Sequence, residues 1–165
     1  MCSTCGKSHP KEETELVLNL PGPIFDLAAD ERDARCDFSD DVCALDRSRF
    51  FVRGLLPLPV HGRDQPYRIG LWAEVAPLAF ERISRLWSDP RQSDEPPIPA
   101  ILANDVPTLP SSVGLEVDIR LTGPTTRPDF ILKPSDHPLS LEQRRGIDAH
   151  RALEFGARRI TRAAS

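Results

Sequence analysis

RFFVRGLLPLPVHGRDQPYRIGLWAEV, residues 49–75, contains the strongest structural signal in the chain. In each half, apolar residues alternate with other residues, and this period of two is typical of a strand with one buried face. The polar run HGRDQ, residues 61–65, separates the halves. The sequence therefore predicts a long antiparallel hairpin whose buried face carries Phe50, Val52, Leu56, Leu58 and Val60 on the first strand and Tyr67, Ile69, Leu71, Ala73 and Val75 on the second.

The patterns on either side of the hairpin predict further strands and helices. Strands are expected at residues 14–20, 42–46, 115–121 and 130–133, and helices at residues 24–35, about 77–88 and about 148–162. The apolar stripe of the last helix would consist of Ala149, Leu153 and Ile160. Residues 88–114 are rich in proline and are expected to form a long irregular connection of the kind that often carries a binding surface. The prediction is an α+β fold with a mainly antiparallel sheet and helices on one side.

Length and composition indicate a single globular domain, residues 1–165, with a metal-binding N-terminal segment (1–13) and an α+β body (14–165). No apolar run approaches the roughly 18 residues of a membrane span. The N-terminus lacks the basic and apolar pattern of a secretory signal, so we expect a cytoplasmic protein. The net charge of −4 argues against a nucleic-acid partner, which would require clustered basic residues.

The four cysteines are the main chemical signal. Cys2 and Cys5 are separated by two residues and followed by Gly6, as in a zinc knuckle, where both thiolates face one ion. A closed structural site needs four ligands, and Cys36 and Cys43 are the remaining cysteines, with His9 as an alternative fourth ligand. The cofactor expected from this set is a structural Zn²⁺. The competing interpretation is that Cys43 is a small core residue and Cys36 an exposed thiol.

Other residues suggest different functions. An enzyme would have its site where the proline-rich segment meets Asp136 and His137, although a structural role for His137 is more common for such a residue. A thiol redox sensor would use Cys2 and Cys5. Trp72 lies on the second face of the hairpin with Arg53 and Phe51; this face is either a partner-binding patch or, as we favour, covered by another segment.

Several short motifs together resemble a known bacterial family. They are Cys2-x-x-Cys5-Gly6, DVCALD (41–46), FFVRG (50–54), GLW (70–72), FER (80–82), DEPP (94–97) and DHPL (136–139). In this combination the chain is similar to the domain of unknown function 2199 family over nearly its whole length. The resemblance implies no activity and no catalytic residue. It implies that Cys2, Cys5 and Cys43 belong together, and it marks Trp72 and His137 as motif residues.

The resulting hypothesis is a small cytoplasmic bacterial binding or accessory module with a structural zinc site. Its partner would be a protein or a small molecule, with no nucleic acid and no membrane. The enzyme and the redox sensor are the alternatives.

Overall fold

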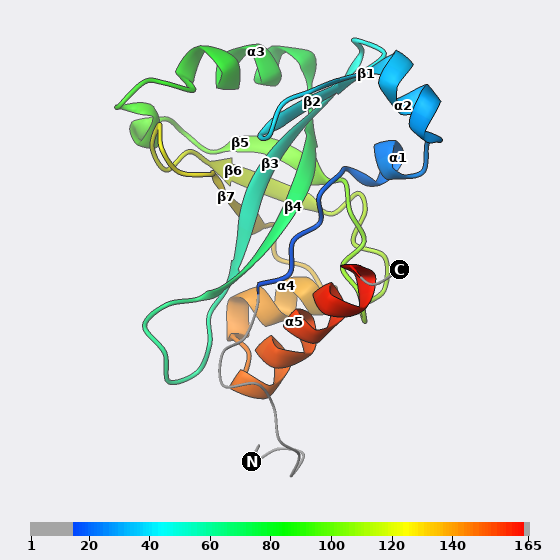
Figure 1. The fold of residues 1–165 in the computed structure, drawn as a ribbon. Helices are drawn as coiled ribbons and strands as arrows, with labels where there is room; N and C mark the ends of the chain where they lie inside the picture. Colours follow the sequence, from blue (N-terminus) through cyan, green and yellow to red (C-terminus); the bar gives the residue numbers. More distant parts are fainter. Residues whose placement is uncertain (1–14, 164–165) are drawn as a thin grey trace.

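The structure is a computed structural model that describes residues 15–163 (Figure 1). The predicted zinc-knuckle segment lies outside these residues. The helices and strands in chain order are α1 (Gly22–Phe25), α2 (Ala29–Arg35), β1 (Cys36–Phe38), β2 (Val42–Leu45), β3 (Arg49–Leu58), β4 (Tyr67–Val75), α3 (Pro77–Leu86), a 3-10 turn (Gln92–Asp94), β5 (Ile98–Leu102), β6 (Glu116–Arg120), β7 (Asp129–Leu132), α4 (Pro138–Arg145) and α5 (Ala149–Ala163).

The seven strands form one sheet in which each strand pairs antiparallel with the next along the chain. The predicted α+β class, antiparallel sheet and central hairpin are confirmed, with β3 and β4 paired from Phe50↔Val75 to Leu58↔Tyr67. The sheet also closes on itself, because β3 pairs in parallel with β7 at Leu55↔Asp129. Strands β3 to β7 thus make a closed five-stranded barrel, and β1 and β2 extend from β3 as a short ribbon.

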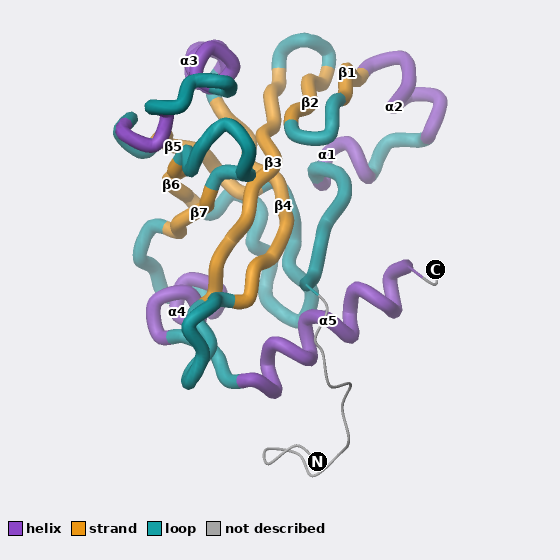
Figure 2. Tube along the Cα trace, turned by 60° about the vertical axis from the view of Figure 1, so that its left-hand side comes forward, coloured by secondary structure: helices purple, strands orange, loops and turns teal. Residues whose placement is uncertain are grey.

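The expectation that the helices share one side was wrong. Figures 1 and 2 show α3 near one end of the barrel, with α1 and α2 beside the β1–β2 ribbon, and α4 and α5 at the opposite end. A closed barrel has two ends and an outer surface to cover, whereas an open sheet offers only two faces. Helix α5 packs through Phe155, whose ring stacks on Tyr67 of β4 with centroids 5.8 Å apart.

Both faces of the hairpin are buried, and they belong to two separate cores. The predicted face fills the barrel, where Leu56, Ile69 and Leu71 are fully buried, while Phe50 at its end is only half-buried. The other face forms a smaller second core, made of Ile24, Cys43, Leu45, Phe51, Trp72 and Ala103. The second core lies against the α1 segment, which explains why this part of the hairpin has no solvated face.

Barrel closure depends on a glycine in β3. The Leu55 N–H donates to the carbonyl of Pro128 (2.9 Å), which joins β3 to the start of β7. Beside it, a Cβ atom on Gly54 would lie within 2.4 Å of the Phe130 ring from β7. One edge of β3 is therefore shared: β2 pairs with residues 49–52, and β7 takes over at Leu55. We call the point between these pairings the strand fork.

The β4–β5 pairing is short, with only Ala73↔Leu102 and Glu74↔Ile101 in register. The N–H of Ala103 donates to Trp72 of β4, whereas the N–H of Leu102 donates to Leu115 on the other side. Since backbone groups alternate sides along a strand, the nitrogen of Pro99 also faces β4, where it has no hydrogen to donate. The two strands separate at this point, and the chain leaves β4 for α3.

Several predicted elements differ in detail. Strand β5 lies inside the proline-rich stretch that was expected to be irregular, and α4 was not predicted as a helix. Of the strand predicted at residues 14–20, the described part (15–20) forms a single bridge, Val17↔Gly70, instead of a strand. The stripe predicted for the last helix is wrong at Ala149, which is exposed, and Leu153 is only half-buried, while α5 packs through Ala152 and Phe155. The side chain of Ile160 lies outside the described part of the structure. Within residues 15–163, none of the helices combines the length and apolar character that a membrane span requires.

Replacing Gly54 with alanine is expected to destabilise the protein by about 1–3 kcal/mol, because the new methyl group overlaps the Phe130 ring. Chemical denaturation measures the change. Gly70→Ala is the matched control in the neighbouring strand, since its Cβ would meet Val17 at an ordinary 3.4 Å and should change stability by less than about 1 kcal/mol. Equal losses in the two variants would contradict the role assigned to Gly54.

Candidate functional site

A hollow of about 470 Å³ lies where β4 and β5 separate. This volume is within the range of small-molecule and peptide-side-chain sites, roughly 300–1,000 Å³. Most of its lining is apolar and comes from the end of β4, the start of α3 and strands β5 and β6: Val75, Ala76, Pro77, Pro99, Ala100, Ile101 and Val117. The polar lining residues are Ser48, Glu74, Glu116 and Lys133. The hollow lies where the β4–β5 pairing stops, beside Pro99, whose nitrogen has no hydrogen to donate to β4.

Three residues stand in a row across the outer face beside this hollow. Ile101 is in register with Glu74 on one side and with Glu116 on the other, and its side chain is 40% exposed. Arg49 donates two hydrogen bonds to the Glu74 carboxylate, at 2.9 and 2.8 Å. Among residues 15–163, the Glu116 side chain has no hydrogen-bond or ion-pair partner. The row thus places an unpaired carboxylate beside an accessible apolar side chain.

The cation in the lining of the hollow, Lys133, is also paired. Its amine lies 3.0 Å from a carboxylate oxygen of Asp118. The unpaired charge of the hollow is therefore negative, and the site favours a positively charged group.

The structure brings Cys36 and Cys43 together, whereas Cys2, Cys5 and His9 lie outside the described residues. Cys36 is in register with Leu45, and Phe38 with Cys43, on adjacent antiparallel strands. Cys36 therefore occupies the same face as Cys43, one diagonal step away. Both contact the second core, where Cys43 is fully buried and Cys36 half-buried. Within residues 15–163, no three potential ligands gather into a metal-binding group.

Burial also determines the acidity of these two thiols. It raises the pKa of Cys43 from its ordinary value of 9.0 to about 12, and the charges of Cys36 and Asp37 act in the same direction. Burial likewise raises the pKa of Cys36. Without a metal, both groups are neutral thiols at neutral pH, and neutral thiols are poor nucleophiles.

His137 contacts the proline-rich segment, as the enzyme hypothesis expected. Its ring nitrogens, however, form hydrogen bonds to backbone groups. Its Nδ1 accepts from the N–H of Leu139 (3.0 Å) and caps α4. Since Nδ1 is the acceptor, Nε2 carries the hydrogen and donates to the carbonyls of Pro110 and Ser111, both at 3.1 Å. Both ring nitrogens are engaged in positioning a helix and a loop.

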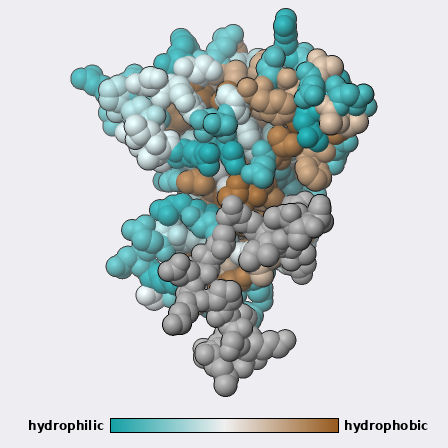
Figure 3. Space-filling model, viewed as in Figure 1, coloured by the Kyte–Doolittle hydropathy of each residue, from teal (hydrophilic) through white to brown (hydrophobic). Residues whose placement is uncertain are grey.

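Trp72 packs and is not a partner-binding residue at the surface. Its side chain is 2% exposed, and its indole N–H donates to the carbonyl of Leu18 (3.1 Å). The guanidinium of Arg53 lies 5.7 Å above the ring. Figure 3 shows hydrophobic residues reaching the surface over the α1–α2 region instead, where Phe25 is 60% exposed.

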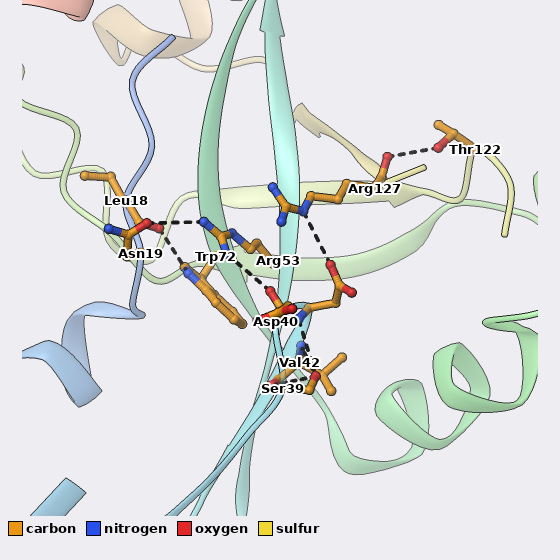
Figure 4. Close-up of polar contacts among 10 residues, drawn as sticks. Leu18, Asn19, Ser39, Asp40, Val42, Arg53, Trp72, Thr122 and Arg127 are labelled. Atoms are coloured by element: carbon orange, nitrogen blue, oxygen red, sulfur yellow. Dashed lines mark hydrogen bonds and ion pairs between the residues drawn. The ribbon is translucent and has the colours of Figure 1, made fainter. Parts of the chain in front are cut away.

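The strand fork collects a second group of charged residues (Figure 4). Arg53 comes from β3 and Arg127 from the loop before β7, while Asp40 and Asp41 precede β2. The backbone N–H of Arg53 donates to the carbonyl of Asp41 (2.8 Å), which continues the β2–β3 ladder by one residue. Arg127 reaches Asp41 from the opposite side, with Nε 3.4 Å from its carboxylate.

Sequence reasoning did not single out Glu74, Ile101, Glu116 or Arg127. Ile101 lies in the proline-rich stretch that was expected to be irregular, and its exposure depends on where β4 ends. Glu116 lies in the strand predicted at residues 115–121, where no local pattern distinguishes it from other exposed residues. No local pattern places Arg127 near Arg53, because the pairing of β3 with β7 brings them together.

Comparison with known proteins identifies a family. The family model described as "Uncharacterized protein conserved in bacteria (DUF2199)" matches residues 1–147. No curated protein and no solved structure matches the chain.

The stability of the metal-free protein is expected to fall between pH 9 and 12, because the Cys43 thiol holds its proton up to about pH 12 only when folded. In this range the unfolded chain binds fewer protons, so the loss is about 1 kcal/mol per pH unit. Denaturation at several pH values should show a shallower decline for Cys43→Ala than for wild type, since other titrating groups are common to both. Identical slopes would show that Cys43 ionises freely in the folded state.

Proposed function

The chain belongs to the bacterial DUF2199 family, and on this premise we propose that it acts as a non-enzymatic binding module. Its binding site would be the hollow between β4 and β5, and its partner a protein segment that carries a lysine or arginine beside an apolar residue. An N-terminal zinc clip would hold residues 1–13 on the β1–β2 ribbon. The cytoplasmic location stays a prediction.

One observation carries the proposal: the unpaired Glu116 carboxylate stands beside the half-exposed Ile101 at the edge of a largely apolar hollow. The apolar lining supplies contact area for an aliphatic or aromatic side chain. The carboxylate supplies selection for a cation, and charges at the rim of a site act mainly on specificity and association rate. Since Arg49 already neutralises Glu74, Glu116 is the group that would meet the partner's charge.

The enzyme alternative has less support. Its expected residue His137 is bonded to backbone groups through both ring nitrogens. In the hollow, Glu74 and Lys133 are each committed to an ion pair. A catalytic site needs a reactive group held free for its substrate, and Glu116 alone does not form such a constellation.

The zinc clip rests on the placement of Cys36 and Cys43. Diagonal neighbours on adjacent strands lie about 7–8 Å apart at Cα and somewhat less at Cβ, which suits two thiolates that share one ion. Cys2 and Cys5 would complete a tetrahedral set, with His9 as the alternative to Cys36. Such an ion would deprotonate the thiols in spite of their burial. Its role would be structural, because four protein ligands leave no open position.

Selection of linear peptides displayed on phage against the full chain tests the binding site. Enriched peptides should carry lysine or arginine next to an aliphatic or aromatic residue. Glu116→Gln should weaken their binding by about tenfold, the order expected for loss of one charge-assisted contact, and Ile101→Ala should do so through lost apolar contact. Fluorescence anisotropy of the labelled peptides measures the affinities.

Glu81→Gln and Val113→Ala are the matched controls, because they remove an exposed carboxylate and a 49% exposed valine outside the hollow. Both should bind the peptides like wild type. The proposed site is wrong if no peptide is enriched, or if the enriched peptides bind Ile101→Ala and wild type equally.

Metal analysis of the chain, purified without chelators or nickel resin, tests the clip separately. About one zinc per chain is expected, and none in Cys5→Ser or Cys43→Ser. The Cys5→Ser variant should also melt at a lower temperature, because structural zinc binding contributes directly to folding. Comparing Cys36→Ser with His9→Ala identifies the fourth ligand. Protein that carries no zinc would remove the clip.

A further inference from the structure

Two arginine side chains meet at the strand fork although they come from distant parts of the sequence. The fork exists because β3 changes partner from β2 to β7, and this change brings the Arg127 loop beside Arg53. Figure 4 shows Arg53 directed toward Trp72 and Asn19. The Nε of Arg127 lies 3.4 Å from the Asp41 carboxylate. This site lies outside the β4–β5 hollow, since no residue is shared with its lining.

The side-chain hydrogen bonds of the two fork arginines are all long. Arg53 donates to the carbonyl of Asp40 at 3.3 Å and to the Asn19 side chain at 3.4 Å. Arg127 donates to Asp41 at 3.4 Å. The Nε of Arg53 is buried and has no partner among the described residues. A buried N–H without a partner is costly, so an acceptor that reached this donor would be favoured there.

The same chain forms much tighter arginine pairs elsewhere. Arg35 binds both carboxylate oxygens of Asp46, at 2.9 and 2.7 Å, and Arg49 binds both oxygens of Glu74, at 2.9 and 2.8 Å. Two parallel bonds of this length are the preferred geometry of a guanidinium with an oxyanion. Arg53 and Arg127 do not form such paired short bonds, so their N–H groups could form stronger hydrogen bonds with a ligand.

The surroundings of Arg53 act on its charge in both directions. Burial lowers the pKa of Arg53, and the positive charge of Arg127 lowers it further. Asp41 and Asp40 act in the opposite direction without cancelling these effects. Arg127 and Asp41 keep 37% and 36% of their side chains exposed, so solutes reach the site from solvent.

We propose that the strand fork is an oxyanion-binding site, in which Arg53 and Arg127 together hold a carboxylate or phosphate group of a small molecule. The ligand takes the buried Nε–H of Arg53 and displaces the Asp41 carboxylate from Arg127. The inference is independent of the proposed peptide site, because the two sites share no residue and select opposite charges.

Titration of the full chain with inorganic phosphate, and separately with succinate, tests the site. The Arg53 Nε–H resonance in ¹⁵N-edited NMR is the readout, and sodium chloride at matched ionic strength is the reference. We expect a saturable shift with at least one of the two oxyanions and none with chloride. The pair of titrations distinguishes a phosphate from a carboxylate ligand. Absence of saturable binding by both would overturn the proposal.

The oxyanion affinities of three variants distinguish binding at the fork from a response to the protein's net charge. Arg127→Gln lies in an exposed loop and should weaken binding by at least about tenfold. Arg35→Gln removes the same charge at a tight pair elsewhere and should have no effect. Asp41→Asn removes the competing carboxylate but keeps the backbone carbonyl that accepts from Arg53, and should tighten binding. The proposal would also be overturned if Arg127→Gln and Arg35→Gln weakened binding equally, or if Asp41→Asn bound the oxyanion more weakly than wild type.

Discussion

The close approach of Gly54 to the Phe130 ring is the constraint on which the rest of the structure depends. It allows β7 to lie against the second half of β3, and this contact converts an open antiparallel sheet into a barrel. The barrel interior then encloses the apolar face of the hairpin. The same closure creates the strand fork, because β3 has one edge to share between β2 and β7.

The two candidate sites arise from opposite interruptions of backbone pairing. At the hollow, Pro99 ends the β4–β5 ladder and leaves an apolar depression beside an unpaired carboxylate. At the fork, two ladders meet on one strand and crowd two guanidinium groups together. Most other charged pairs of the chain are short, such as Arg151 with Glu142 at 2.8 Å. Both candidate sites therefore lie where regular strand pairing is broken.

Local patterns predicted the parts of the fold that depend on local periodicity. The alternation in residues 49–75 predicted the central hairpin, and helical spacing predicted α3 and the position of α5. Barrel closure was not predictable in this way, since it rests on one residue pair, Leu55↔Asp129, between distant segments. Strand β5 was missed because its prolines resemble a loop. The candidate site was found only in part: the pattern brought Cys36 and Cys43 under consideration, but Glu116 and Arg127 gain their significance from neighbours in space.

Pro99 also affects how the molecule behaves toward copies of itself. Where β4 and β5 separate, the sheet offers a short exposed edge, and exposed edges are the usual templates for intermolecular strand addition. A proline whose nitrogen faces that edge removes one donor that an incoming strand would need. The proline that lines the hollow thus also disfavours the addition of a strand from another molecule at this seam.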